Sequence, residues 1–317
     1  MRSHLAPYAV VACATTATAH IRPLDSGAGF HAVPGSTLPA GTWRISLRAD
    51  GTNFRDSTPA EAVEIASGQG RYDYVQYEHV ESAGISLGVT DTIQIDARTG
   101  WYTGSGFVQA TDGPDGVAAG VADPSGLTDT WITSRWRVVD DPAMKSQAAL
   151  IAGVRLPTGD DEERLDDGTL LDPDDQPGGG GVGFVFGVGW TQSPAHQLTV
   201  DASALWTENR SHDGFEEGDR FDVAIACAWR VQEDASAWPT WTLVAEILGE
   251  WTDHDERDGV SDGISGGSSL YGAPGVRCRF SEHGALGVSM PIPISQELEG
   301  HQAEERLRAT VTLDLYF

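Results

Sequence analysis

The chain ends on the stretch LRATVTLDLYF, residues 307–317, in which every second residue is apolar. The apolar set is Leu307, Ala309, Val311, Leu313, Leu315 and Phe317. Polar or charged residues stand between them, among them Arg308 and Asp314. An alternation with a period of two is typical of a β-strand that has one apolar and one polar face. The stretch therefore predicts a final strand whose two faces meet unlike surroundings.

The same alternation recurs along the chain, and no convincing amphipathic helix is predicted after residue 20. It is clearest over residues 93–101, 182–190, 198–206, 221–229, 241–251 and 286–294. Less regular strands are predicted near residues 42–50, 72–88, 129–139, 146–157 and 268–280. With the final strand, the predicted strands number twelve.

The connections between these strands are of two kinds. The long ones lie near residues 51–71, 104–128, 158–180, 209–218, 253–267 and 296–304. The short ones lie near residues 88–91, 140–145, 192–196, 232–238 and 281–283. Long and short connections alternate strictly, as in an up-and-down meander with one elaborate and one plain end.

These features predict an all-β protein, a single up-and-down antiparallel transmembrane β-barrel of about 12 strands. A sheet in a bilayer must close on itself because lipid cannot hydrogen-bond an open edge. Aromatic residues near the predicted strand ends suit the membrane interfaces; they are Trp101, Trp190, Trp206, Trp229, Trp241 and Trp251. A soluble β-sandwich is the alternative, since period-two strands are equally natural there. The alternating connection lengths disfavour it.

The composition excludes several other classes. Of 317 residues, 40% are hydrophobic, which is too many for a disordered chain. Acids outnumber bases 47 to 20, for a formal charge of −27, which argues against nucleic acid as a partner. No apolar run reaches about 18 residues, so membrane-spanning helices are not predicted.

The N-terminus has the features of an export signal. Arg2 precedes a short apolar stretch, and Ala17-Thr18-Ala19 fits a signal-peptidase site. We therefore expect residues 1–19 to be a signal peptide and residues 20–317 to form the barrel domain. The expected location is the bacterial outer membrane, in contact with lipid and lipopolysaccharide, with both termini in the periplasm.

The charges divide between loops and lumen. Acidic residues crowd two long connections, over residues 160–175 and 253–262. On the strands, the polar parity predicts a set of lumen-facing, candidate pore-lining residues that leans basic. This set is Arg44, Arg48, Asp96, Arg98, Arg135, Arg137, Arg155, Asp201, Asp222, Arg230, Glu246, Glu250, Arg277, Arg279, Arg306, Arg308 and Asp314.

Two roles are open for these charges. They either satisfy one another in a network that fills the bore, or line a passage that selects small anions or the polar parts of a solute. About eight strands give a filled interior and about sixteen an open channel, so twelve is intermediate. Gly183, Gly187 and Gly189 are predicted to face inward on one strand and make room in the bore.

Specific chemistry is weakly signalled. The acidic loops could attract divalent cations, but residues 253–262 lack the spacing of a calcium-binding loop. We therefore favour solvated loops that divalent ions bridge loosely to the outer leaflet. The sequence has no Gly-x-Ser-x-Gly, His-Glu-x-x-His or Cys-x-x-Cys motif. We therefore predict no enzymatic activity and no cofactor.

Several runs carry a family resemblance. They are SGLTDTW at residues 125–131, ALIAGVRLPTG at 149–159, LDPDDQPG at 171–178 and GDRF at 218–221. The chain resembles the putative MetA-pathway-of-phenol-degradation family of outer-membrane proteins, from about Pro39 onward. The resemblance implies an outer-membrane barrel with a role in the uptake of aromatic or other hydrophobic compounds.

Two functions follow as expectations. The first is a passive, porin-like transporter for small solutes, aromatic or hydrophobic ones included. The alternative is a plugged structural or interaction barrel, whose acidic outer loops bind divalent ions, lipopolysaccharide or a partner.

Overall fold

The structure, a computed structural model, describes residues 29–317 except 56, 114–115 and 235–237. The predicted signal peptide, residues 1–19, lies outside the described residues. Strands make up 64% of the structure and helices 5%, in agreement with the predicted all-β class.

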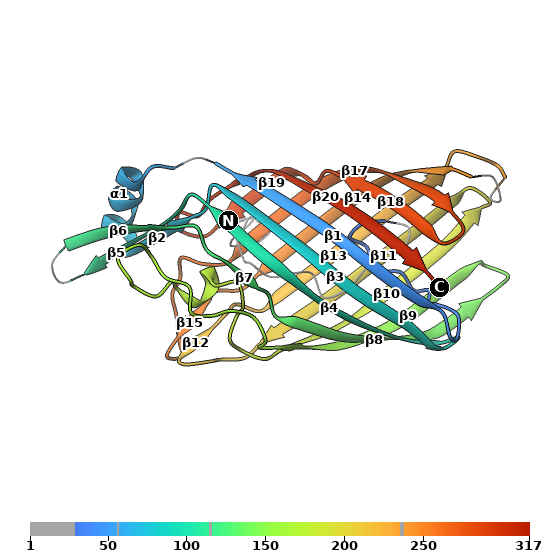
Figure 1. The fold of residues 1–317 in the computed structure, drawn as a ribbon, viewed down its shortest axis with the longest axis horizontal. Helices are drawn as coiled ribbons and strands as arrows, with labels where there is room; N and C mark the ends of the chain where they lie inside the picture. The colour runs from blue at the N-terminus through green and yellow to red at the C-terminus, as the bar shows by residue number, and fades with distance from the viewer. Residues whose placement is uncertain (1–28, 56, 114–115, 235–237) are drawn as a thin grey trace, which may run out of the picture.

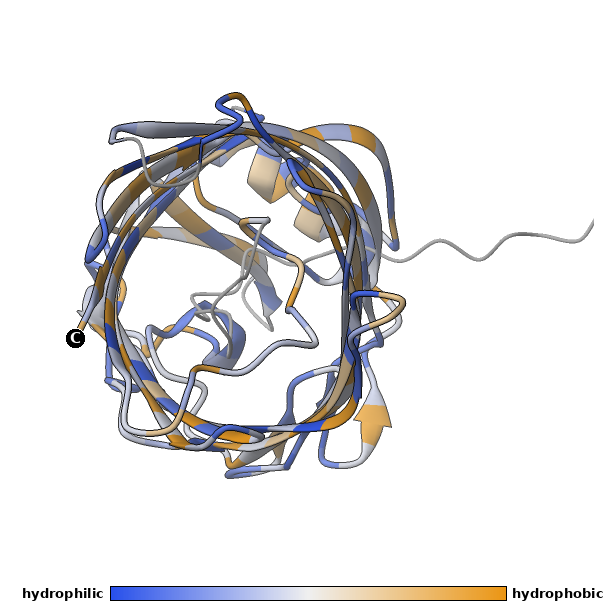
Figure 2. Ribbon diagram, turned by 90° about the vertical axis from the view of Figure 1, so that its right-hand side faces the viewer, coloured by the Kyte–Doolittle hydropathy of each residue, from blue (hydrophilic) through white to orange (hydrophobic). Residues whose placement is uncertain are grey.

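Twelve antiparallel strands of the described chain form one closed barrel (Figures 1 and 2), which confirms the predicted architecture. Each pairs with the next, and the last pairs with the first. The strands are β1 (Trp43–Phe54), β3 (Tyr77–Thr90), β4 (Ile93–Ser105), β8 (Thr130–Asp141), β9 (Ser146–Leu156), β10 (Gly183–Ala195), β11 (Leu198–Asn209), β13 (Arg220–Arg230), β14 (Thr240–Thr252), β17 (Gly267–Ser281), β18 (Gly284–Ser289) continued by β19 (Ile292–Leu298), and β20 (Glu305–Tyr316).

The final strand closes the barrel, as its alternation predicts. β20 pairs with β1 from Arg44↔Tyr316 to a bulge beside Asn53. Two backbone hydrogen bonds between Trp43 and Phe317, of 3.0 and 2.9 Å, extend this pairing to the last residue. Closure matters because an open sheet edge would leave backbone groups unpaired in the bilayer.

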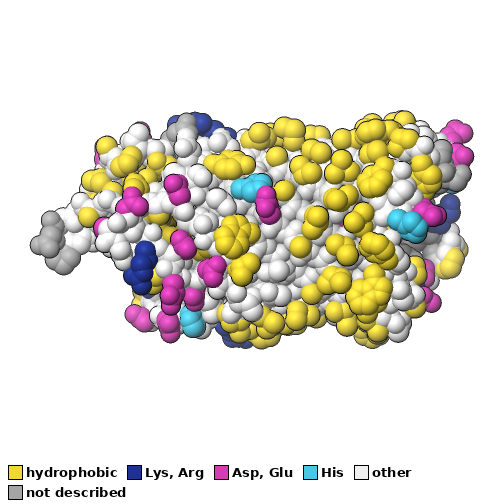
Figure 3. All heavy atoms as spheres, in the orientation of Figure 1, with side chains coloured by type: hydrophobic (Ala, Val, Ile, Leu, Met, Phe, Trp, Pro, Cys, Tyr) yellow, Lys and Arg dark blue, Asp and Glu magenta, His cyan; other side chains and the backbone are white. Residues whose placement is uncertain are grey.

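The barrel has an apolar outside and a polar inside. On the closing strands Leu47 is 47% exposed and Val311 43%, whereas Arg48 is 5% exposed and Thr310 is fully buried. Apolar side chains are spread over much of the visible wall (Figure 3). Of the predicted aromatic belt, Trp101, Trp206, Trp229 and Trp241 are exposed, whereas Trp190 and Trp251 are half-buried. This outer face suits a hydrocarbon environment.

One end carries short turns and the other carries the long connections (Figure 1). The elaborate end includes a small sheet of β2 (Arg71–Tyr74), β5 (Phe107–Gly113) and β6 (Gly116–Ala122), and another of β12 (Phe215–Glu216), β15 (Glu256–Arg257) and β16 (Val260–Ser261). β7 (Ser125–Leu127) and the 3₁₀ turn η1 (Pro173–Asp175) lie in the same connections. The predicted strand at residues 72–88 is thus two strands, because β2 leaves the barrel wall.

The helix α1 (Pro59–Gln69) contradicts the prediction that no helix follows residue 20. It begins at Thr58 with a capping box completed by Glu61, and it buries Ala62 and Ala66 against the β2–β5 sheet. Two alanines make a weak apolar stripe, so the sequence showed little amphipathic pattern. No helix in the described ranges is long and apolar enough to cross a membrane.

Candidate functional site

The chain's own N-terminal segment lies inside the barrel, a feature that the sequence analysis did not predict. Residues 29–35 are all buried, and residues 36–38 are half-buried. Figure 2, which looks along the barrel, shows ribbon that is not part of the wall inside the ring of strands. Near the short turns, the Ala40 amide donates to the Asp91 carboxylate at 3.0 Å. We call residues 29–38 the lumen segment.

Glu246 on β14 is the main anchor of the lumen segment. Its carboxylate accepts hydrogen bonds from three successive backbone amides, those of Phe30 (2.9 Å), His31 (3.0 Å) and Ala32 (3.1 Å). Hydrogen bonds to an ionised acceptor are stronger than bonds to a neutral one. A segment without a strand partner thus satisfies its amides on a wall carboxylate.

Other wall residues satisfy the rest of the segment's backbone. Three oxygens accept its amides at 2.9 to 3.1 Å; they belong to Ser203, Thr191 and Gln94. Three arginines donate to its carbonyls at 2.7 to 3.1 Å; they are Arg277 to Gly29, Arg48 to Phe30 and Arg135 to Ser36. Together with β14, which carries Glu246, seven strands therefore hold the segment through side chains rather than through sheet pairing.

Glycines in the wall make room for the segment. A Cβ at Gly275 or Gly287 would lie 2.7 or 2.5 Å from the Phe30 ring, and one at Gly189 would lie 2.6 Å from the Pro34 carbonyl oxygen. All three separations are shorter than any normal carbon contact. The space predicted at Gly189 exists, and the lumen segment occupies it.

Ion pairs lie in the part of the lumen toward the elaborate end. Arg308 contacts Glu305 at 2.7 Å and Glu250 at 2.9 Å, and its guanidinium lies over the Tyr271 ring. On the other side, Arg155 contacts Glu217 at 2.9 Å. Charged side chains in this region therefore pair with one another, and they also face the bore.

The mouth at the short turns is open and basic. A cavity of about 520 Å³ lies there, lined by Arg230, Arg277, Arg279, His196 and Glu282 among others. Arg230 donates to the carbonyl of His196 at 3.0 Å, and Arg279 donates to the carbonyl of Glu282 at 2.7 Å. Three guanidinium groups against one carboxylate give this chamber a positive potential toward the bore.

The structure places the seventeen candidate pore-lining residues at three levels of burial. Nine are buried: Arg44, Arg48, Asp96, Arg98, Arg135, Arg155, Asp201, Glu246 and Glu250. Six are half-buried: Arg137, Asp222, Arg230, Arg277, Arg308 and Asp314. Two are exposed: Arg279 at the basic mouth and Arg306 near the elaborate end.

Arg306 departs from the predicted parity. The pairing of β1 with β20 shifts between Asn53 and Phe54, where Phe54 pairs with Glu305. The bulge leaves Arg306 exposed and makes Glu305 the buried residue. Strict alternation cannot foresee a bulge, because the extra residue breaks the period of two.

Five further acids point to the interior and reduce the predicted basic excess. They are Asp50, Glu78, Asp129, Glu217 and Glu305, of which Asp50 receives two bonds from Arg48. Most of them lie where the predicted strands end or lose their regularity. The acidic residues that the sequence analysis assigned to two long loops did not indicate that these five acids would lie inside the barrel.

The acidic loops are less solvated than predicted. Asp174 and Asp255 are buried, and Asp172 is half-buried. Burial raises the pKa of Asp172 to about 7, although Arg71 opposes the rise. Burial likewise raises the pKa of Asp174. These carboxylates belong to a packed rim rather than to loose loops.

A closed barrel with an apolar belt, short turns at one end and a charged lumen defines a transmembrane β-barrel of the outer-membrane type. Within this class, the chain belongs to the family described as Putative MetA-pathway of phenol degradation, whose sequence profile matches residues 46–295. The resemblance in the sequence is thus confirmed.

Solved structures of similar fold are outer-membrane proteins. The COG4313 outer membrane channel from Pseudomonas putida F1 is similar with a TM-score of 0.60 at 12% identity, over 89% of this chain and 97% of that one. The KdgM porin is more distant, with a TM-score of 0.46 at 8% identity over 86% of this chain and 99% of that one. A Pseudomonas aeruginosa FadL homologue has a TM-score of 0.43 at 11% identity over 96% of this chain and 98% of that one. At these identities the likeness shows the fold alone. No curated protein sequence matches the chain.

Proposed function

We propose that this barrel is a passive, porin-like channel for small solutes. The observation that carries the proposal is the basic chamber of about 520 Å³ at the short-turn mouth, which leads to the lumen segment. The segment is held by side chains rather than by the wall's ladder of backbone bonds, so its release leaves the barrel closed and intact. A passive channel needs no cofactor, because bore and charge select the solute.

The solutes that fit the chamber are small and carry a polar or anionic group. Arg230, Arg277 and Arg279 offer guanidinium groups that bind carboxylates and phenolates and also stack on aromatic rings. Membership in a family described by phenol degradation supports a small aromatic solute. The ion pairs deeper in the lumen favour the passage of polar solutes over that of purely apolar ones.

The proposed orientation places the short turns in the periplasm and the elaborate rim outside, as bacterial barrels do. The C-terminal Phe317 lies at the short-turn end (Figure 1), so it is periplasmic in this orientation. Outer-membrane lipid then contacts the apolar belt, and lipopolysaccharide surrounds the elaborate end.

Ion selectivity in a planar bilayer tests the proposal. The purified protein should show single-channel conductance with a preference for anions. The double change Arg230→Gln and Arg279→Gln should shift the reversal potential toward cations. Arg164→Gln, which removes one exposed charge from the elaborate rim, is the matched control and should shift it little.

A barrel without conductance in any variant would overturn the channel proposal. It would favour the second candidate, a plugged structural barrel. That candidate has one specific observation in its support, the complete burial of residues 29–35 within the bore.

A further inference from the structure

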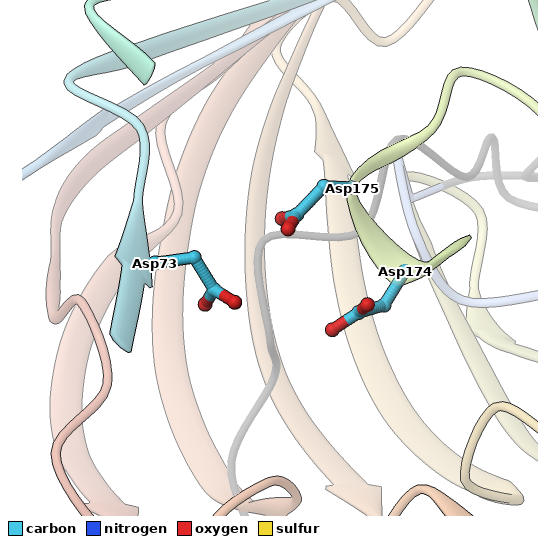
Figure 4. A group of neighbouring side chains, drawn as sticks. All are labelled: Asp73, Asp174 and Asp175. Carbon is cyan, nitrogen blue, oxygen red and sulfur yellow. The ribbon is translucent and has the colours of Figure 1, made fainter. Parts of the chain in front are cut away.

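Three aspartates converge at the elaborate rim, away from the basic mouth. Asp73 lies on β2, and Asp174 and Asp175 lie on η1, about a hundred residues later in the chain. One carboxylate oxygen of each lies within 4.8 Å of the others. Figure 4 shows the three side chains pointing toward one another from the two elements.

The positive charges around these aspartates do not balance them. Arg71 contacts Asp73 (2.8 Å), Asp172 (3.2 Å) and Asp174 (2.7 Å). Arg257 contacts Asp172 (3.3 Å) and Asp174 (3.8 Å). Two guanidinium groups thus face four carboxylates, counting Asp175. With all four carboxylates ionised, the difference is two negative charges, which one divalent cation neutralises.

Buried oxygens around the cluster lack donors. Asp174 is only 4% exposed. Its Oδ1, together with Asp175 Oδ2 and Gln302 Oε1, is buried and receives no hydrogen bond from any described residue. Buried polar atoms are normally satisfied, so several unsatisfied ones in one place need an explanation. In the described part of the chain, Arg257 Nη2 is the one buried donor beside them without a hydrogen bond, and it lies 3.8 Å from Asp174 Oδ1. Three acceptors against one donor leave a deficit that a cation corrects.

The same residues surround a space of suitable size. A cavity of about 30 Å³ is lined by Asp73, Asp174, Asp175 and Gln302, together with Tyr74 and Tyr102. A site needs roughly 10–15 Å³ to hold one water-sized particle. The cavity therefore takes an ion, with room for little else.

We propose that Asp73, Asp174, Asp175 and the amide oxygen of Gln302 bind one Ca²⁺ ion. The donors are all oxygens, which hard cations prefer. Opposite ligands of Ca²⁺ lie about 4.6–5.2 Å apart, twice its usual ligand distance, which accommodates the separation of the aspartate oxygens. The ion joins β2 to η1 and so fixes the long connection between β9 and β10 against the rim.

The test uses the full-length barrel in detergent after treatment with a chelator. Calorimetric titration with Ca²⁺ should show one site per chain, with weaker binding of Mg²⁺. Tb³⁺ should show luminescence sensitised by Tyr74 and Tyr102, and Ca²⁺ should displace it. Asp175→Asn should weaken Ca²⁺ binding roughly 10-fold or more, since even outer partners of metal sites have effects of this size.

Asp175→Asn is a mild change because no described residue hydrogen-bonds the Asp175 Oδ2 atom. Asp166→Asn removes an exposed charge from the same connection and should leave the affinity unchanged. If Asp175→Asn perturbs the metal-free rim in near-UV circular dichroism, Asp73→Asn takes its place. The absence of saturable Ca²⁺ binding, or equal affinities in the Asp166 and Asp175 variants, would overturn the proposal.

Discussion

The lumen segment should leave its place when Glu246 loses its charge. The carboxylate accepts three amides at 2.9–3.1 Å. In Glu246→Gln one acceptor oxygen becomes an NH₂ group, so at least one bond is lost and the others become neutral. Charge-assisted bonds contribute about 1.5–3 kcal/mol each and neutral ones about 0.5–1.5 kcal/mol. The state with the lumen segment held in the bore should therefore lose about 3 kcal/mol of free energy relative to the released state. The ratio of held to released molecules should fall on the order of 100-fold.

Two assays report this release. Open probability in a planar bilayer should rise in Glu246→Gln, because the segment lies in the bore. Cysteine labelling gives an independent measure: Ala32 is fully buried, so Ala32→Cys should react with a bulky maleimide only after release. The labelled protein needs Cys227 and Cys278 replaced by Ser beforehand.

The matched control is Glu304→Gln, which removes one exposed carboxylate at the elaborate rim. It should change neither open probability nor labelling. If folded Glu246→Gln protein is labelled at the rate of the unsubstituted chain, the carboxylate does not hold the segment, and the reasoning fails.

Two further predictions concern the wall. Gly287→Ala places a Cβ about 2.5 Å from the Phe30 ring, so it should displace the segment and raise open probability. Gly272→Ala, whose Cβ would meet a side chain at an ordinary 3.4 Å, should not, and equal effects would contradict the proposed contact. Arg308→Met removes the guanidinium that contacts the buried carboxylates of Glu250 and Glu305, so it should lower the free energy of unfolding by about 3–5 kcal/mol. Urea denaturation in lipid vesicles measures that loss, and an unchanged midpoint would refute it.

The wall was predictable because its physics is local in sequence. A strand between lipid and a polar lumen must alternate apolar and polar residues, as in residues 307–317. An up-and-down order of strands gives connections that are short at one end and long at the other. The same rule failed at Arg306, where a bulge adds one residue, and at α1, whose buried stripe consists of Ala62 and Ala66.

The lumen segment has no comparable pattern in its sequence. Its backbone partners are side chains between 18 and 248 residues away, and it has no regular secondary structure to impose a period. A buried backbone without a sheet partner must still satisfy its amides and carbonyls. The inward charges of the wall were predicted, but nothing in the pattern tells a pore-lining arginine from one that binds a carbonyl.

The structure separates these two roles. Arg48 and Arg135 donate to carbonyls of the lumen segment, so their charges hold the obstruction in place, whereas Arg277 both donates to Gly29 and lines the chamber. Arg230 and Arg279 donate instead to carbonyls of the short turns and face the open chamber. Changes in the first set should alter how often the bore opens, whereas changes in the second should alter which ions pass. Occlusion and selectivity are therefore separable properties of one charged lumen.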